Sequence, residues 1–352
     1  MPELPEVETI RRGLKEVIVG KKIIGFEKRD PKIIQFEPEN IEGYSISDIE
    51  RRAKILIFRL SHGRKDLSHV APSELRGTQL PLTPTAKGGF EMGQDDKIML
   101  VHLKMTGQLI WEENPGVKDF QLRKGPSTPL RAEIRRISGG HPSPDWVAKL
   151  PNAYTRAIVR FEDGSVLFFN DLRRFGYMKL YSIQDSEFRI QNQSKYTMTG
   201  FSDIPELSKL GPEPFSAEFT VEYLMRKAAK IPNRKTKQFI TDQEIISGVG
   251  NIYVDEALFY AKISPLRLVK DIKLNEWQKI RDSIIKALEL GLEYGGSSED
   301  TYVDAFGNQG TMNDHTKVYR HTGADCPASC GGTIKRIVIG GRGTHFCPKC
   351  QS

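Results

Sequence analysis

The chain has 352 residues, of which 38% are hydrophobic, and its 52 Lys and Arg outnumber its 45 Asp and Glu. This composition excludes an intrinsically disordered chain, and the length corresponds to two or three domains. No stretch reaches the roughly 18 consecutive apolar residues of a membrane span. Three glutamates stand where a secretory signal would place an apolar run. We therefore expect a cytoplasmic protein with no membrane partner.

The first half of the chain is predicted to be mostly sheet, preceded by one helix. Apolar residues recur after Pro5 at helical spacing: Val7, Ile10, Leu14 and Val17. This helix should end at Gly20. Short β-rich runs follow at 55–60 and 98–111, and Asp163-Gly164 separates two further runs as a hairpin turn would.

From about residue 206 the pattern changes to helices. In the clearest of these predicted helices, apolar residues recur at helical spacing: Trp277, Ile280, Ile284 and Leu288. Asn275 and Gln278 are spaced as a capping box, and Gly295-Gly296 should end this helix. The polar stretch 183–205 is predicted to contain a domain boundary. Two other stretches, 72–96 and 113–151, are interpreted as mobile surface insertions, and extra DNA or partner contacts are the alternative.

Residues 234–265 predict two helices joined by the turn Gly248-Val249-Gly250-Asn251. The first turn of the second helix is expected to contain Asp255 and Glu256. A glycine turn at a helix start can present free N–H groups to an anion, although an ordinary interhelical turn would read the same way. Basic residues precede it, among them Lys237.

All the cysteines lie in one cluster near the C-terminal end: Cys326, Cys330, Cys347 and Cys350. Their spacing is typical of two thiolate knuckles that close on one structural Zn²⁺ with no open coordination position. Free thiols or two disulfides are the alternative. The β-prone run 333–339 and the turn 340–343 between the knuckles predict a hairpin with Arg342 at its tip.

The segment that contains this cluster is basic. Residues 315–352 hold six Lys and Arg and one Asp, out of a formal net charge of +7 for the chain. This concentration of charge predicts an anionic partner. A guanidinium flanked by glycines could bind a phosphate or read a base, although a solvated arginine is an equally good interpretation of Arg342 alone.

The N-terminus offers a nucleophile. The initiator Met would be removed before the small Pro2, which would leave a secondary amine. Such an amine can attack an aldehyde-like sugar carbon and form a cationic iminium that permits elimination. The adjacent Glu3 could move protons at the reacting centre. Taken alone, a Met-Pro start without any function is the commoner case.

Six motifs then converge on one family: MPELPEVETIRRGL at the start, RRAK at 51–54, HLKMTG at 102–107, NDLRRFG at 170–176, DQEIISGVGNIYVDEAL at 242–258 and GGRGTHFCPKCQ at 340–351. Together they closely resemble the formamidopyrimidine-DNA glycosylases. The resemblance implies an α+β fold: an N-terminal β-sandwich with flanking helices (1–190), a helix-two-turn-helix domain (205–300) and a zinc-bound β-hairpin (315–352).

The resemblance also implies a function in base excision repair. It indicates a monomeric bacterial DNA glycosylase with apurinic/apyrimidinic lyase activity. Its partner would be damaged duplex DNA at the nucleoid, and it would need one structural zinc and no organic cofactor. The implied substrates are oxidised purines: 8-oxoguanine opposite cytosine, and formamidopyrimidines.

Site residues follow from the motifs. Pro2 matches the nucleophile and Glu3 the acid/base group. Lys54 matches a lysine of β-elimination and phosphate contact, and Arg342 an arginine of δ-elimination and strand binding. Three more match side chains that enter the DNA helix: Met105, Arg173 and Phe175. Lys237 and Asn251 match phosphate-binding positions, and residues 295–318 resemble a loop over the extruded base.

Some positions depart from the family pattern. The family's histidine-rich run before the hairpin strand is replaced by Tyr154-Thr155-Arg156, so its DNA contact is in doubt unless Arg156 substitutes. The first cysteine knuckle has one additional residue, which zinc tolerates. The alternatives are an endonuclease VIII-like glycosylase for oxidised pyrimidines and a non-catalytic DNA-binding zinc protein. PELPEVET rather than PEGPE, and the intact LRRFG, favour the purine enzyme.

Overall fold

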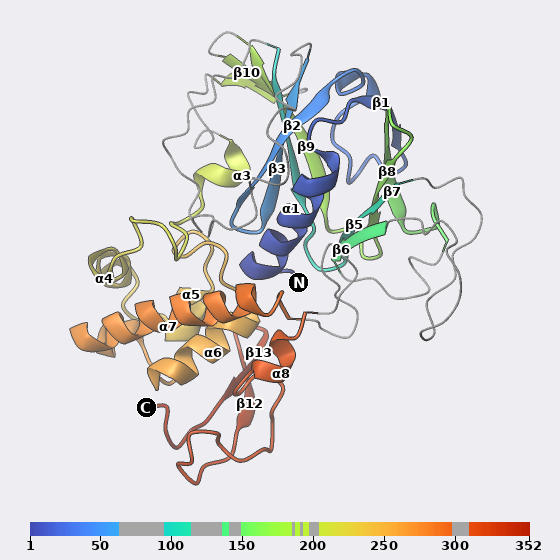
Figure 1. Ribbon diagram of the computed structural model, residues 1–352. Helices are drawn as coiled ribbons and strands as arrows, with labels where there is room; N and C mark the ends of the chain where they lie inside the picture. Colours follow the sequence, from blue (N-terminus) through green and yellow to red (C-terminus); the bar gives the residue numbers. More distant parts are fainter. Residues whose placement is uncertain are drawn as a thin grey trace, which may run out of the picture.

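The computed structural model describes residues 1–62, 95–113, 136–140, 149–184, 187–190, 193–196, 204–297 and 310–352. Its strands form a sandwich, most of its helices gather below, and the C-terminal hairpin projects beyond them (Figure 1). Most of the predicted insertions and half of the predicted loop 295–318, residues 298–309, lie outside the described residues.

Two antiparallel sheets form the sandwich. One has the order β1 (Ile23–Lys28), β7 (Thr155–Phe161), β8 (Val166–Asp171), β5 (Gly107–Glu112) and β6 (Arg136–Gly140). The other has the order β11 (Gln193–Tyr196), β10 (Glu187–Ile190), β9 (Tyr177–Gln184), β4 (Lys97–His102), β3 (Ile55–Ser61) and β2 (Ser45–Arg52). The predicted hairpin is confirmed, since β7 pairs with β8 and Gly164 has a φ of 84°.

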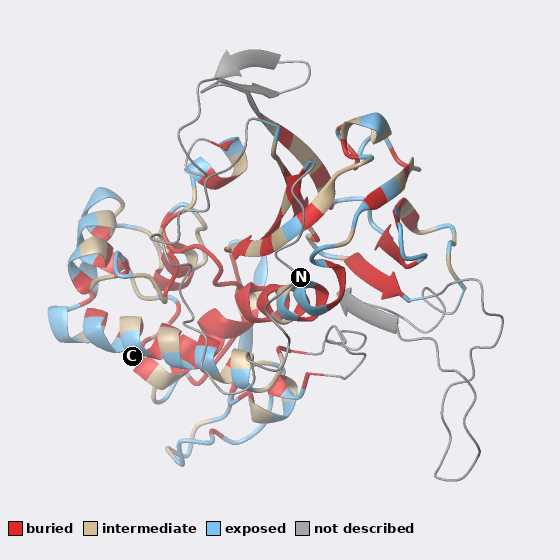
Figure 2. Ribbon diagram, turned by 45° about the horizontal axis from the view of Figure 1, so that its top comes forward, coloured by how far each residue is buried: buried red, intermediate tan, exposed pale blue. Residues whose placement is uncertain are grey.

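The first helix, α1 (Leu4–Ile18), is confirmed and connects the two parts of the molecule. Val7, Ile10 and Leu14 pack into the sandwich core. The 3₁₀ turn η1 (Pro38–Asn40) contacts β1. Leu4, one turn earlier, belongs instead to the core of the helical part. The start of α1 is therefore fixed between the two cores, where Figure 2 shows buried residues gathered.

The helical part comprises α3 (Pro205–Ser208), α4 (Val221–Lys230), α5 (Thr236–Ile240), α6 (Asn251–Ala261), η3 (Val269–Asp271), α7 (Leu274–Glu293) and α8 (Met312–His315). Its core contains Phe239, Tyr253 and Trp277. Gly295 and Gly296 follow α7 with φ of 69° and 88°, which confirms the predicted end. The six-stranded sheet continues to Tyr196, so the change from sheet to helix falls between that residue and α3.

Two details of the predicted helices are wrong. The cap of α7 uses Glu276, whose Oε2 accepts the Lys273 backbone N–H at 2.7 Å, rather than Asn275 and Gln278. Arg267 binds the same carboxylate and fixes it in that position. Helix α6 begins at Asn251, so Asp255 and Glu256 lie in its second turn.

The C-terminal hairpin consists of β12 (Lys335–Ile339) and β13 (Arg342–Phe346). Its turn is shorter than predicted and contains only Gly340 and Gly341, whose φ values are 56° and 75°. Positive φ at both central residues characterises the type I′ turn that suits hairpin twist. Arg342 consequently begins β13, opposite Ile339, at the tip.

Candidate functional site

Residues 2 and 3 lie buried between the sandwich and the helical part. The Leu4 N–H donates to Gly248 O at 3.1 Å, and the Ile252 N–H donates to Glu3 Oε1 at 3.0 Å. A Cβ on Gly250 would lie 2.3 Å from Glu3 Oε1, so any larger residue there would displace the Glu3 carboxylate. The turn before α6 therefore holds the N-terminus in place as well as starting a helix.

Lys54 completes this buried group. It follows Ala53 in the turn between β2 and β3, is 4% exposed, and its Nζ donates to Val249 O at 3.1 Å. Burial raises the pKa of Glu3 and lowers the pKa of Lys54, while the attraction between the two charges opposes both shifts. Among the described residues, Glu3 Oε2 has no hydrogen-bond partner. Burial therefore favours the uncharged form of each group, the protonated Glu3 carboxyl and the deprotonated Lys54 amine.

His102 and Lys104 lie near Lys54, and neither was among the predicted site residues. Burial lowers the pKa of His102 far below its ordinary value, and the charges of Lys104 and Lys54 lower it further. The Lys104 backbone N–H donates to His102 Nδ1 at 3.0 Å. Their presence within HLKMTG, beside Met105, was the available signal.

A buried ionic network supports the Lys54 turn, and this too was not foreseen. Arg51 donates to Glu8 at 3.0 Å and to both Glu213 oxygens at 2.6 and 3.2 Å. Glu213 also accepts the Ala53 backbone N–H. Glu213 lies between α3 and α4, so this contact ties the turn to the helical part.

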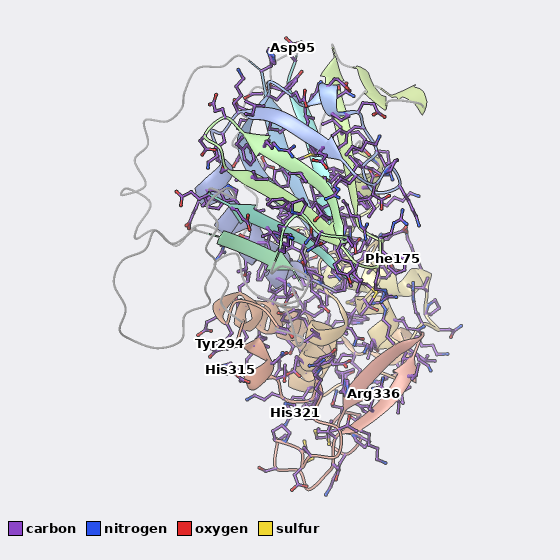
Figure 3. All side chains as sticks on the ribbon, turned by 90° about the vertical axis from the view of Figure 1, so that its right-hand side faces the viewer. Asp95, Phe175, Tyr294, His315, His321 and Arg336 are labelled. Carbon is purple, nitrogen blue, oxygen red and sulfur yellow. The ribbon has the colours of Figure 1, made fainter. Side chains whose placement is uncertain are left out.

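The structure brings the predicted intercalating side chains together. Met105 and Phe175 are 42% and 50% exposed, which is unusual for large apolar residues, and they lie on neighbouring loops after β4 and β8. Arg173 lies 4.9 Å from the Phe175 ring centre, and its Nη1 is 3.3 Å from Met105 Sδ. Phe175 lies at the edge of the sandwich that faces the helical part (Figure 3).

Arg342 and Lys237 lie near each other at a cavity of about 360 Å³ between α5 and the hairpin tip, which Arg234 and Gln238 also line. Lys237 is only 1% exposed, and its Nζ donates to Asp255 Oδ1 at 2.7 Å and to Gly343 O at 3.0 Å. Burial lowers its pKa and Asp255 opposes this. Lys237 therefore joins helix to hairpin.

The acids of α6 hold the hairpin and the segment 317–319 that precedes the cysteine cluster. Asp255 Oδ2 accepts the His345 backbone N–H at 2.8 Å, and Glu256 accepts three consecutive backbone N–H groups of residues 317–319 at 2.7 to 2.9 Å. Asn251 starts the same helix, and its Oδ1 is buried without a partner among the described residues. The acidic side chains therefore have a docking role, which no local sequence pattern indicated.

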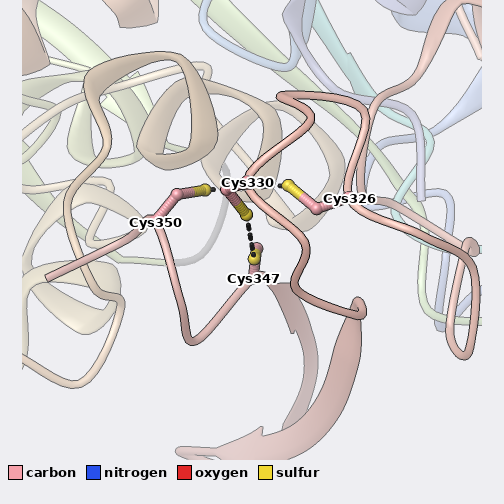
Figure 4. A group of neighbouring side chains, drawn as sticks. All are labelled: Cys326, Cys330, Cys347 and Cys350. Atoms are coloured by element: carbon pink, nitrogen blue, oxygen red, sulfur yellow. Dashed lines mark hydrogen bonds between the residues drawn. The ribbon is translucent and has the colours of Figure 1, made fainter.

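The four cysteine sulfurs converge at the end of the hairpin opposite its tip (Figure 4). All lie within 4.8 Å of one another, with Cys326–Cys350 and Cys330–Cys347 at 3.7 and 3.6 Å. Tetrahedral zinc with bonds of about 2.3 Å requires sulfur separations of about 3.8 Å. The donor set and its size fit one structural Zn²⁺ with a closed shell.

Arg156 is not arranged as a free phosphate ligand. Its Nε donates to Asp171 O at 2.9 Å, and its side chain is 15% exposed. The same guanidinium lies 3.9 Å from Asp30. Arg156 therefore supports the loop after β8 through its hydrogen bond to the last residue of that strand.

The fold and this site together define a zinc-containing helix-two-turn-helix DNA glycosylase. Family profiles match along the chain: the Formamidopyrimidine-DNA glycosylase N-terminal domain at residues 1–178, its H2TH domain at 210–303, and the zinc finger found in FPG and IleRS at 326–352. The chain belongs to the formamidopyrimidine-DNA glycosylase family, whose enzymes act in base excision repair.

Individual relatives span the whole chain. It is 32% identical to the formamidopyrimidine-DNA glycosylase of Streptococcus pneumoniae serotype 4, covering 100% of this chain and 99% of the relative. The enzyme of Ligilactobacillus salivarius is 34% identical with the same coverage.

Solved structures agree with this result. A Lactococcus lactis FPG variant in complex with Fapy-dG containing DNA is 30% identical, with full coverage of both chains and a TM-score of 0.68. The MutM (FPG) protein from Thermus thermophilus is 30% identical with a TM-score of 0.67, covering 99% of this chain and 98% of that one. In the described part of the chain, no helix combines the length and apolarity required to cross a membrane.

Proposed function

We propose that this glycosylase removes 8-oxoguanine opposite cytosine, and formamidopyrimidines, from duplex DNA, and then cleaves the abasic strand. One observation carries the proposal: residue 2, Glu3 and Lys54 are all buried between the sandwich and the helical part. The exposed side chains predicted to intercalate, Met105 and Phe175, lie on the same sandwich domain. The Fapy-dG containing DNA in complex with the Lactococcus lactis relative supports a damaged-DNA substrate.

Pro2, freed of Met1, is the nucleophile. Its amine forms a bond to C1′ while the bond from C1′ to the base breaks and the base leaves with that electron pair. The amine then loses its proton, and the C1′–O4′ bond breaks as the nitrogen lone pair forms the iminium with C1′ and Glu3 protonates the ring oxygen. The raised pKa of Glu3 favours the protonated form that this requires. The resulting iminium acidifies the neighbouring C–H and permits β-elimination of the 3′ phosphate.

Lys54 and Arg342 serve the later steps. The lowered pKa of Lys54 increases the fraction of neutral amine that can accept the sugar proton. Arg342 binds the lesion strand and assists δ-elimination from the tip of the hairpin. The four cysteines would hold Zn²⁺, which supplies the rigidity that fixes this tip.

Recognition depends on extrusion of the damaged nucleotide, at a cost of a few kcal/mol. Met105 and Arg173 fill the vacated space, Arg173 contacts the orphaned cytosine, and Phe175 enters the base stack. Asn251, at the start of α6, binds a phosphate. Lys237 contributes to phosphate binding together with its docking role. We assign these functions to domains at 1–190, 205–300 and 315–352.

Borohydride reduction of the enzyme with an 8-oxoguanine duplex tests the chemistry. A covalent adduct should form, and after trypsin digestion the DNA remnant should lie on peptide 2–11. The Glu3→Gln variant should trap far less, whereas Glu289→Ala on the exposed face of α7 should match the native protein. A remnant on a lysine-containing peptide would overturn the nucleophile. Faster trapping on a thymine glycol duplex would instead favour the pyrimidine alternative.

A further inference from the structure

The carboxylate of Asp171 lies between the two loops that carry the exposed intercalating side chains. Asp171 ends β8, is 0% exposed, and pairs with Gly107 across the sheet. Its Oδ2 accepts the Gly176 N–H at 2.7 Å, and its Oδ1 accepts the Arg173 N–H at 3.2 Å. One buried carboxylate thus binds both ends of the loop 172–176.

Thr106 extends this binding to the second loop. Its hydroxyl donates to Asp171 Oδ1 and accepts the Arg173 N–H at 2.9 Å. Thr106 directly follows Met105, and Arg173 is two residues before Phe175. The three intercalating side chains are consequently attached to one hydrogen-bonded unit, although they come from positions about 70 residues apart in the sequence.

Close backbone packing leaves this unit little freedom. A Cβ on Gly107 would lie 2.4 Å from Leu103 O, and one on Gly176 would lie 2.9 Å from His102 O. Arg174 has a φ of 57°, and its guanidinium binds both oxygens of Asp30 at 2.7 and 3.0 Å. The bend after Asp171 is therefore fixed by close packing at Gly176 and by the ion pair between Arg174 and Asp30.

We propose that Asp171 and Thr106 are positioning residues that join the two loops into a single rigid wedge for nucleotide extrusion. This rests on the proposed function. A wedge that replaces a stacked base must hold its shape when it enters the duplex, because otherwise the binding energy is used to order the loops. The hydroxyl and the carboxylate provide that order before DNA binds.

Thr106→Val, with Asp171→Asn as a second variant, tests the assignment in the full-length protein under single-turnover conditions. Excision of 8-oxoguanine from a duplex should slow by about tenfold or more, as expected for loss of a hydrogen bond to a charged group. Strand cleavage at a preformed abasic site, which has no base to extrude, should slow less than about threefold on the same reasoning. Thr106→Ser, which keeps the hydroxyl, should restore the native ratio of the two rates.

Equal slowing on both duplexes, or no slowing, would overturn the wedge assignment while the proposed function stands. Inactivity of the native protein on both duplexes would overturn the proposed function and the wedge with it. Asp282→Asn on the exposed face of α7 is the matched control and should leave both rates unchanged. Thr106→Val should unfold in urea along the same curve as the native protein while its excision is slowed. If the variant is partly unfolded to an extent that accounts for the slowing, the assignment is refuted.

Discussion

Removing the Glu213 carboxylate is expected to destabilise the protein and impair the site together. Glu213 is 1% exposed in its side chain and Arg51 is 4% exposed, so Glu213→Ala would leave a buried guanidinium with Glu8 as its remaining acidic partner. The Ala53 N–H would also lose its acceptor. Breaking a buried ion pair from one side costs about 3–5 kcal/mol. Because Glu8 remains, we expect a loss of about 3 kcal/mol, at the lower end of that range.

Urea unfolding measures this loss from the shift in midpoint at a common m value. Glu213→Gln should lose less, about 2 kcal/mol, because the amide oxygen can still accept one of the hydrogen bonds. Glu289→Ala, on an exposed helix face, is the control and should stay within about 0.5 kcal/mol of the native protein. The reasoning would be refuted if Glu213→Ala were as stable as this control.

The same variant should also trap DNA more slowly, because Glu213 fixes the turn that presents Lys54. Trapping should be measured in the absence of urea, at a temperature where the variant is fully folded by circular dichroism. A native trapping rate in a destabilised variant would separate stability from the site and contradict the positioning of Lys54 by this network.

Two further predictions concern pH and metal. Burial alone would raise the pKa of Glu8, but Arg11, Arg51 and Arg12 outweigh it and lower the pKa from 4.5 to about 2. The ionised Glu8 carboxylate therefore stabilises the fold by about 3 kcal/mol above pH 4.5, and this contribution is lost as the pH falls from 4.5 through 2. The free energy of unfolding of Glu8→Gln should depend less on pH across that window than that of the native protein. Chelation of zinc should release the hairpin and weaken duplex binding, since zinc contributes about 10–16 kcal/mol in zinc-finger peptides. Fluorescence anisotropy with unchanged affinity after chelation would contradict this.

Some elements could be predicted because their signals are local. The apolar spacing of Val7, Ile10 and Leu14 requires one helix face, and that face is buried. Two cysteine pairs with short internal spacing need only a hairpin to bring them together, and the sulfurs do meet. The helix α7 was also correct, whereas its cap was not, because capping residues fit neighbouring registers and Arg267, from outside the helix, selected Glu276.

Other features depended on contacts between distant residues. Glu3 and Ile252 are 249 positions apart, and Lys54 and Val249 are 195 apart, yet each pair shares a hydrogen bond. The motif around Lys237 suggested phosphate binding, and no local pattern indicated that its ammonium group would also be buried against Asp255.

Local sequence patterns were thus sufficient for helices α1 and α7, the two hairpins and the cysteine cluster, whereas the reactive groups were predicted only from the resemblance to a family. Tertiary structure alone decided the protonation tendencies of Glu3 and Lys54, because burial and the neighbouring charges shift the pKa. It also decided that Asp171 holds two loops together, since a carboxylate binds whichever donors the fold brings within hydrogen-bond distance. Hydrophobic period and turn chemistry act over a few residues, whereas desolvation and pairing depend on the whole folded chain.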